Sequence, residues 1–512
     1  MSTSPDPALA RPNATDVEWA GNFSHASVPL IVAGAGLVLV AACNLAVAWL
    51  PAHYQVTRLN LDGLGNWPAV AIGYGAATLV AFCCYAVAWR ESRRLLPTRL
   101  NLVVVCTFPV VAALLLFPTY PLLSRDFFYT VMNARVMAVY HHNPFQTPPG
   151  AFPTDPFLPF SDWHQLTNPY GPLWAVIVGT VGRVTGSGIL ATFLIFKALF
   201  LVAFLGMTGL FAWFLRRTAP ERLLPGLVLW SWNPLVLVET VADGHHDVIM
   251  LMLVLLAIMF ATSDQPVLAV VAMVLAGDIK QTAFGIVPVL LVYLLRREPS
   301  FRHGVRRLAP GLLVAAGLQA VLYAPFWVGW RPTVIGFFHQ TQSYIATPSA
   351  LARLLLLIVF AHPGPAIHAS AVLVGVVVYA RLLWRLPGNL DGLLRGIYGA
   401  MLLAILIWPV FYPWYLLWLI VPAAALSAGS VSRQVIIVSV AAALSYLDLY
   451  GLRHIQAHSP QFWSAVEAVT VFGALLATAI WDRAEKSGGP VPVRESPNQP
   501  LPQTNSLAGQ EE

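Results

Sequence analysis

Long apolar runs recur along almost the whole chain, and they constrain its fold more than any other feature. Of the 512 residues, 58% are hydrophobic and only 10% are charged, and this charged share is less than half that of an average soluble domain. A helix needs about 20 apolar residues to cross a bilayer. Because backbone polar groups must be satisfied inside the membrane, the sequence predicts an all-α polytopic membrane protein.

The apolar runs predict about fourteen transmembrane helices. They are expected at residues 29–50, 68–89, 101–122, 188–214, 223–240, 247–262, 266–279, 281–295, 308–327, 366–385, 394–411, 413–428, 434–450 and 461–481. The transmembrane domain would span residues 28–483, with a catalytic outer loop at 124–174. Residues 1–27 and 484–512 are expected to be disordered cytoplasmic segments, because they have few apolar side chains to bury.

Arginines in the short loops predict the orientation of the chain. They fall into four clusters, at residues 90–99, 216–222, 296–307 and 381–395. All four lie on one side if the apolar segments 170–185 and 350–362 do not cross and instead lie along the outer interface as amphipathic helices. That side should be the cytoplasm. The net charge of +6 then reflects topology, and no basic domain indicates a nucleic-acid partner.

Residues 124–174 form a polar and aromatic island between apolar runs. Asp126 follows the third predicted span, where ionisable groups are costly and usually functional. Its carboxylate can accept a proton from an attacking hydroxyl, and the neighbouring Arg125 would keep it ionised. The alternative is an interfacial ion pair that only ends the span. The other charged and imidazole side chains of the island are Arg135, His141, His142, Asp155, Asp162 and His164.

A second polar cluster occupies residues 233–250, NPLVLVETVADGHHDVIM, at the predicted outer mouth of a span. Adjacent histidines point to different faces of a helix, and the i, i+3 or i, i+4 spacing of helical metal sites is lacking. We therefore interpret the cluster as a functional polar site rather than a tight metal site, with a solvated loop as the alternative. Its ionisable residues are Glu239, Asp243, His245, His246 and Asp247.

Two further features are predicted on the same side of the membrane. Lys280 lies between two short apolar runs. There it either snorkels to the interface or holds a phosphate as a point charge. Arg331, in a later outer loop, offers similar assistance. Tyr412 and Trp414 belong to the aromatic turn 411–415, which can stack on a sugar ring or simply anchor the chain at the interface.

Several functional classes are disfavoured. The sequence contains no Gly-rich phosphate loop or nucleotide-binding fold, so an ATP-driven pump and a soluble nucleotide-sugar site do not fit. All four cysteines lie in apolar runs, where they behave as small hydrophobes, and no disulfide framework or zinc site follows. The main alternative to a membrane enzyme is a transporter or flippase of lipid-linked sugars, although internal repeats are not evident. A polymerase or ligase acting on lipid-linked sugars is a second one.

The order of these motifs resembles that of the C-type (GT-C) integral-membrane glycosyltransferases. Among them it is most similar to the bacterial polyprenyl-phosphomannose-dependent mannosyltransferases of actinobacteria, over roughly residues 101–430. The motifs are SRD at 124–126, YGPLW at 170–174, NPLVLVE at 233–239, GHHD at 244–247, Lys280 between two short spans, and FYPWYLLW at 411–418.

The resemblance implies roles for individual residues. Asp126 matches the catalytic base of the first outer loop, and Asp247, rather than Asp243, matches the supporting acid of the second. Lys280 matches a basic residue close to the lipid phosphate. The segment SRDFFYT lacks the second acid that follows the first in some relatives, so no cofactor is assigned and a divalent cation remains possible. Besides Asp126, the predicted substrate-binding residues are Arg125, Tyr170, Trp174, His245, His246, Asp247, Lys280, Arg331, Tyr412 and Trp414.

The resemblance also implies an activity and a location. The expected reaction is inverting transfer of a hexose, with mannose favoured, from a polyprenyl-phosphate sugar to a glycan or lipid-linked glycan. It would take place on the outer face of the bacterial cytoplasmic membrane. The expected partners are the lipid-linked donor, the acceptor and membrane lipid.

Overall fold

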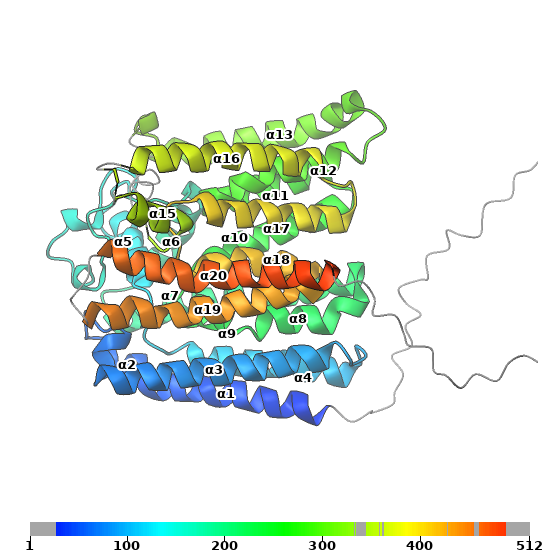
Figure 1. The fold of residues 1–512 in the computed structure, drawn as a ribbon. Coiled ribbons are helices and arrows are strands. Elements are labelled where there is room, and N and C mark those ends of the chain that lie inside the picture. The colour runs from blue at the N-terminus through cyan, green and yellow to red at the C-terminus, as the bar shows by residue number, and fades with distance from the viewer. Residues whose placement is uncertain are drawn as a thin grey trace, which may run out of the picture.

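The computed structural model describes residues 27–331, 333, 345–357, 359–360, 363–426, 429–454 and 460–487. This part of the chain is a bundle of helices without any strand (Figure 1), which confirms the predicted all-α class. Almost all of the two segments expected to be disordered lies outside the described residues. The last helix continues to Ser487, slightly past the predicted domain end at residue 483.

The described α-helices have the following bounds. They are α1 (Val28–Val47), α2 (Leu50–His53), α3 (Trp67–Ser92), α4 (Arg99–Leu116), α5 (Asp126–Ala138), α6 (Pro172–Val184), α7 (Ile189–Thr218), α8 (Leu223–Ser231), α9 (Pro234–Leu237), α10 (Asp247–Thr262), α11 (Pro266–Ile279), α12 (Val287–Leu295), α13 (Phe301–Tyr323), α15 (Pro348–Leu356), α16 (Gly364–Trp384), α17 (Leu390–Ile407), α18 (Leu417–Leu426), α19 (Gly429–His454) and α20 (Pro460–Ser487).

Nine helices of the described residues are long and apolar enough to cross a membrane, and one bent pair raises this number to ten. The chain is therefore a polytopic membrane protein, as predicted, but helix length does not confirm the expected count of fourteen. Five further apolar helices have only 10–17 residues, fewer than the roughly 20 that a full crossing requires. They include α6, and α15 is shorter still with 9 residues.

The bent pair joins Pro220–Ser231 to Pro234–Ala242 at an angle of 56°. Pro234 has no N–H to continue the first helix, and the Asn233 side chain caps the second by accepting from the Leu235 amide at 3.0 Å. The Asn233 side chain also donates to Ser439 Oγ on α19 at 3.1 Å. A buried amide with partners on two helices holds the bend in place and directs the next residues toward the loops.

The four arginine clusters lie at one end of the bundle, opposite α5 and α6 (Figure 1). Arg222 forms an ion pair with Asp391 at 3.1 Å, and Arg296 donates to the Leu383 carbonyl at 3.2 Å. Arg433 lines a cavity together with Arg90, Arg93 and Arg94 of the first cluster. We call this side the arginine end, and the side that carries α5 and α6 the loop end.

Two short neighbouring helices place polar residues below the surface of the loop end. Helices α10 and α11 have 16 and 14 residues, which at 1.5 Å per residue gives lengths of about 24 and 21 Å. They pack against each other and turn at residues 263–265 at the arginine end. Asp247 begins α10 and Lys280 follows α11, so both side chains are recessed at the opposite end.

Candidate active site

Asp126 is the first residue of α5 and lies at the loop end. Its amide donates to Ser124 Oγ at 3.2 Å, and its Oδ1 accepts a hydrogen bond from Trp163 Nε1 at 3.0 Å. Asp126 is half-buried, whereas Phe127 and Phe128 beside it are fully buried. The aromatic packing fixes the start of α5, and the carboxyl group remains within reach of a ligand.

Arg125 has a different set of partners from those predicted. Its guanidinium lies 2.9 Å from Asp162 Oδ1 and donates to the carbonyls of Thr57, at 2.8 Å, and Phe160. It therefore ties two loop segments together rather than facing the carboxyl of Asp126. The expectation that Arg125 keeps Asp126 ionised is corrected to that of a residue that holds the loop, and direct binding of substrate by Arg125 stays a prediction.

The GHHD segment begins with a glycine that its conformation requires. Gly244 has a φ of +76°, and a Cβ at this position would lie 2.9 Å from the ring of Phe127 and 3.0 Å from that of Phe200. It follows a π-helical turn, η6 (Val238–Ala242), and such turns often occur at functional sites. The tight turn brings the two histidines that follow it under the segment 124–174.

His245 links this turn to the polar island, residues 124–174. Its Nδ1 lies 2.9 Å from the Glu239 carbonyl oxygen and 3.2 Å from Glu239 Oε2, and its Nε2 lies 3.2 Å from Ser124 Oγ. Tyr446 on α19 donates to Glu239 Oε1 at 2.8 Å. A continuous series of polar contacts thus runs from Tyr446 through Glu239, His245 and Ser124 to the amide of Asp126.

His246 occupies an aromatic slot formed by the YGPLW segment. Its ring stacks on Trp174 at a centroid distance of 4.6 Å and meets Tyr170 edge-on at 4.2 Å. Burial lowers the pKa of His246 to about 3, so its imidazole is neutral. Trp174 and Tyr170 are only 2% and 9% exposed, so both rings of the slot are buried.

Lys280 and Asp247 form a buried ion pair. Lys280 Nζ lies 2.8 Å from Asp247 Oδ1, which also accepts from Trp418 Nε1 at 2.5 Å. The ammonium lies 4.6 Å from the ring centroid of Tyr415 and 5.2 Å from that of Trp418, within the range of cation–π attraction. The N-terminus of α10 and the C-terminus of α11 favour these charges as well. Lys280 is thus held inside the site and does not snorkel.

The aromatic turn continues into the 3-10 turn η10 (Pro413–Leu416) and covers the histidine. Trp414 stacks between Tyr412, at 4.5 Å, and His245, at 3.9 Å. Trp414 is 5% exposed, and Tyr412 is half-buried. The more exposed face of this stack is therefore contributed mainly by Tyr412.

Several charges act on the carboxyl group of Asp126. Burial raises its pKa above the usual range, and the positive charges of His245 and Lys280 oppose this rise, while the Asp247 carboxylate adds to it. Burial by itself would lower the pKa of His245, but the carboxylates of Glu239, Asp126 and Asp247 together more than offset it, so the pKa lies above its usual value. Asp126 is therefore a carboxyl group whose ionisation depends on neighbouring cations.

A close backbone approach locks the YGPLW segment onto the Lys280 turn. A Cβ on Gly171 would lie 2.1 Å from the Asp278 carbonyl oxygen, and the Gly171 amide donates to the Ile279 carbonyl at 3.4 Å. Only glycine fits at this contact. Through this contact, the end of the polar island and the residue preceding Lys280 are held next to each other.

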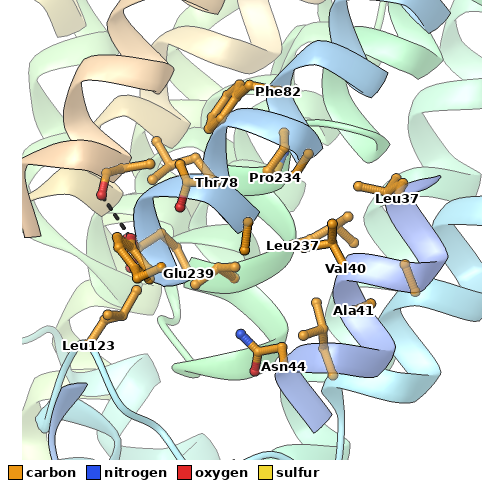
Figure 2. A pocket seen from close by; sticks show the side chains of 18 of the residues that line it. Leu37, Val40, Ala41, Asn44, Thr78, Phe82, Leu123, Pro234, Leu237 and Glu239 are labelled. Atoms are coloured by element: carbon orange, nitrogen blue, oxygen red, sulfur yellow. Dashed lines mark hydrogen bonds between the residues drawn. The ribbon is translucent and has the colours of Figure 1, made fainter. Parts of the chain in front are cut away.

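An apolar cavity of about 80 Å³ lies behind the GHHD turn, between α1, α3, α4, α9 and α19. Figure 2 shows Leu37 and Phe82 on its apolar side and Glu239 at its polar end. Glu239 accepts the hydrogen bond from Tyr446 there. Glu239 thus separates this cavity from His245. The first two spans contribute to the site by surrounding the carboxylate that holds His245 with apolar side chains.

The remaining predicted residues differ in their placement. Arg331 is exposed, and no interaction found among the described residues joins it to the cluster, so it is not placed in the site.

Trp163 and Tyr446 are contact residues that the sequence reasoning missed. Trp163 lies in the polar island next to Asp162 and could have been suspected from that position, whereas Tyr446 lies in a long apolar helix and carried no such signal. In the described part of the chain, no group of three His, Cys, Asp or Glu side chains could hold a metal ion.

A family model described as "Alpha-(1->6)-mannopyranosyltransferase, N-terminal domain" matches residues 31–296, more than half of the chain. The chain belongs to this family. A second model, described as the MptB C-terminal domain, matches residues 365–479. The first match contains Asp126, the GHHD turn and Lys280, and the second contains the aromatic turn. The predicted resemblance to bacterial mannosyltransferases is confirmed, and the family match starts earlier than residue 101, so it includes the first two spans.

Individual relatives resemble shorter regions. The chain is 26% identical to alpha-(1->6)-mannopyranosyltransferase A of Corynebacterium glutamicum over 167 residues, which is 32% of this chain and 33% of the relative. It is 26% identical to the protein of the same name from Mycobacterium tuberculosis over 205 residues, 38% of this chain and 39% of that relative. The matched regions therefore span less than two fifths of the length of either relative.

Proposed function

We propose that this chain transfers an α-mannosyl residue from a polyprenyl-phosphate donor to a hydroxyl group of a glycan or lipid-linked glycan. Family membership supports mannosyl transfer, since both relatives are named for it. The observation that carries the proposal is the arrangement at the loop end. There, the charges of Lys280 and His245 act on the Asp126 carboxyl group, Asp126 in turn acts on Tyr412, and Trp414 stacks on both Tyr412 and His245.

In the proposed reaction, Asp126 accepts the proton of the acceptor hydroxyl as its oxygen attacks the anomeric carbon of the donor. The new C–O bond forms on the face opposite the phosphate. The bond between the anomeric carbon and the phosphate oxygen breaks, and its electron pair leaves with polyprenyl phosphate. This displacement inverts the configuration of the anomeric carbon.

Lys280 would stabilise the negative charge that collects on the departing phosphate, an electrostatic contribution of the kind that often dominates catalysis. Asp247 and the rings of Tyr415 and Trp418 hold the ammonium in place before substrate arrives. An arriving phosphate would share the ammonium with Asp247. Asp247 thus positions the cation, while Tyr412 offers a ring face to the acceptor or donor sugar.

His245, rather than Arg125, supplies the positive charge that favours ionisation of Asp126. Its imidazole is supported by Glu239 and contacts Ser124, two residues before Asp126. A protonated His245 favours the ionised form of Asp126. Glu239 is therefore proposed as a positioning residue, acting on the base through the histidine.

We also propose that the loop end faces outward, with the reaction on the outer face of the cytoplasmic membrane. The four arginine clusters at the opposite end support this orientation, because short cytoplasmic loops carry an excess of arginine and lysine. A polyprenyl chain would then lie in the bilayer, with its phosphate at the level of Lys280.

The proposal is tested with purified full-length protein in lipid–detergent micelles, supplied with polyprenyl-phosphate mannose or glucose and an oligomannoside acceptor. Mass spectrometry should detect free polyprenyl phosphate and an extended acceptor. Asp126→Asn should lower this release by about a hundredfold or more, because general-base catalysis is worth 10²–10⁴-fold. Asp264→Asn, an exposed acid in the turn at the arginine end, should retain most of the activity.

Unchanged transfer by Asp126→Asn would refute the assignment of the base. If no donor releases polyprenyl phosphate, while vesicles that contain the protein move lipid-linked sugars between leaflets, the transporter alternative replaces the transferase. Both outcomes can be read without knowing the natural acceptor.

A further inference from the structure

A second large cavity lies at the arginine end, far from the proposed reaction site. It has a volume of about 610 Å³ and lies between α3 and α19. The mechanism proposed above makes no use of it. The lining residues that matter here are Trp89, Arg90, Arg93, Arg94, Arg433 and Ile437.

The arginines of this cavity differ in how their charges are satisfied. Arg433 is neutralised by Asp482 at 3.0 Å and Glu485 at 2.6 Å. Arg94 forms an ion pair with Glu91 at 3.1 Å. Arg90 and Arg93 are exposed, and neither forms an ion pair with a carboxylate in the described part of the chain.

Another arginine-lined cavity at the same end shows the contrast. It is bounded by α11, α12 and α13 and has a volume of about 60 Å³. Arg307 there binds Asp264 at 2.6 Å and Glu298 at 2.5 Å, and Arg297 donates to the Ala261 carbonyl at 2.8 Å. Its charges are matched internally, so the cavity needs no anion. The cavity between α3 and α19 instead presents two guanidinium groups without a matching carboxylate.

The rest of the lining is apolar. Ala86, Ile436 and Ile437 line the cavity with the arginines, and Ile437 is 37% exposed. The guanidinium of Arg93 lies 4.9 Å from the ring centroid of Trp89, whose indole nitrogen has no hydrogen-bond acceptor among the described residues. The cavity therefore joins anion-binding groups to a hydrocarbon surface.

We propose that this cavity binds the phosphodiester headgroup of an anionic membrane lipid. Arg90 and Arg93 contact the phosphate oxygens, for which guanidinium groups form strong charge-assisted hydrogen bonds. The acyl chains lie along Ile436 and Ile437. Basic pockets between transmembrane helices on the cytoplasmic side bind such headgroups, and a free phosphate would leave the apolar wall uncovered.

The test uses the purified full-length protein, delipidated and then titrated with phosphatidylglycerol or phosphatidylcholine in the same detergent. Native mass spectrometry should show phosphatidylglycerol retained on the wild type, with a rise in the thermal unfolding midpoint. Arg90→Gln/Arg93→Gln should weaken retention by about tenfold or more, because two charged hydrogen-bonding groups are lost. Both side chains are exposed, so the variant is expected to fold.

The matched control is Arg302→Gln/Arg306→Gln. These two arginines are also exposed and lie at the same end on α13, but they do not line the cavity. This variant should retain phosphatidylglycerol as the wild type does, and inorganic phosphate or glycerol 3-phosphate should not raise the unfolding midpoint.

Three results would overturn the proposal. They are equal retention by the Arg90/Arg93 variant and the wild type, equal loss in the control variant, and stabilisation by inorganic phosphate alone, which would indicate a site for free anions. Sugar transfer is measured separately at the loop end, so the transferase proposal can fail without affecting this one.

Discussion

The ionisation of Asp126 depends on side chains that lie near it in the fold rather than on Arg125, the residue before it in the sequence. Burial raises its pKa, while the positive charges of His245 and Lys280 lower it. Arg125, the neighbour in sequence, binds Asp162 and loop carbonyls instead. A base of this kind must be ionised to accept a proton, so activity is expected to rise with pH as Asp126 loses its own proton.

Glu239→Gln should move the acidic limb of the kcat/KM profile to higher pH. The substitution removes the carboxylate that raises the pKa of His245, and a neutral His245 no longer lowers the pKa of Asp126. Because the base works when it is deprotonated, a higher pKa shifts the rise in activity upward, by on the order of one pH unit. The measurement is kcat/KM for sugar transfer between pH 4 and 9.

Tyr446→Phe is the control for this profile. It removes one hydrogen bond to Glu239 but keeps the carboxylate, so its profile should stay close to that of the wild type. A Glu239→Gln profile that coincides with the wild type in pH dependence would contradict the role assigned to His245.

Breaking the ion pair between Lys280 and Asp247 should be costly. Asp247→Asn leaves a buried ammonium without its carboxylate, and losing one partner of a buried pair destabilises a protein by about 3–5 kcal/mol. The double variant Asp247→Asn/Lys280→Met should recover much of the thermal unfolding midpoint but not sugar transfer. Activity in the double variant close to that of the wild type would show that Lys280 does not act on the phosphate.

At the scale of elements, the site is formed by interruptions in helices. The bend at Pro234, the π-helical turn η6 and the short helices α10 and α11 stop polar residues inside the bundle instead of at its surface. Helix α6 and the end of the catalytic loop then dock onto the Lys280 turn at Gly171. The relative position of the base and the cation depends on this contact.

Gly171→Ala should separate the catalytic loop from the Lys280 turn. The new methyl group would lie 2.1 Å from a main-chain oxygen, which cannot move as a side chain does. We expect kcat/KM to fall by about tenfold to a hundredfold, because a displacement of about 1 Å can cost this much. The measurement is steady-state sugar transfer by protein with an unaltered yield after purification.

Gly186→Ala is the matched control, since a Cβ at that position meets nothing within 4 Å. It should transfer sugar at the rate of the wild type. Equal activities of the two alanine variants would mean that the docking at Gly171 is not required.

At the scale of the whole molecule, the two ends of the bundle have different chemistry. The loop end contains the proposed base, the cation and the aromatic stack, and the arginine end contains the four basic clusters and the cavity between α3 and α19. The helices between them isolate the two sets of charges. Orientation in the membrane therefore decides which compartment each set faces.

Cysteine labelling tests this orientation. In a background without Cys43, Cys83, Cys84 and Cys106, single cysteines replace Ala151 at the loop end and Arg302 at the arginine end, both exposed positions. A membrane-impermeant maleimide added to intact cells should label Ala151→Cys and leave Arg302→Cys unlabelled until the cells are opened. The reverse pattern would place the reaction in the cytoplasm.

The sequence by itself determined the membrane class, the approximate positions of the helices and the motifs that carry the chemistry. These are local properties, because apolar length and the spacing of Pro, Gly and charged residues can be read within a window of about 20 residues. For this reason the polar break at Lys280 was located in advance. The bend at Pro234 was not, because residues 223–240 were predicted as one span. Element lengths were less accurate, since the sequence suggested fourteen full spans where several helices are short.

Only the tertiary structure decided which polar groups meet. His245 reaches Ser124 across 121 residues, Trp418 reaches Asp247 across 171, and Tyr446 reaches Glu239 across 207. Such contacts depend on how helices pack, and an apolar helix shows the same hydropathy whichever neighbour it faces. Arg125 illustrates the consequence, because its adjacency to Asp126 suggested a pairing that the folded loop replaced with Asp162. The residue types came from the sequence, and their partners from the packing of the bundle.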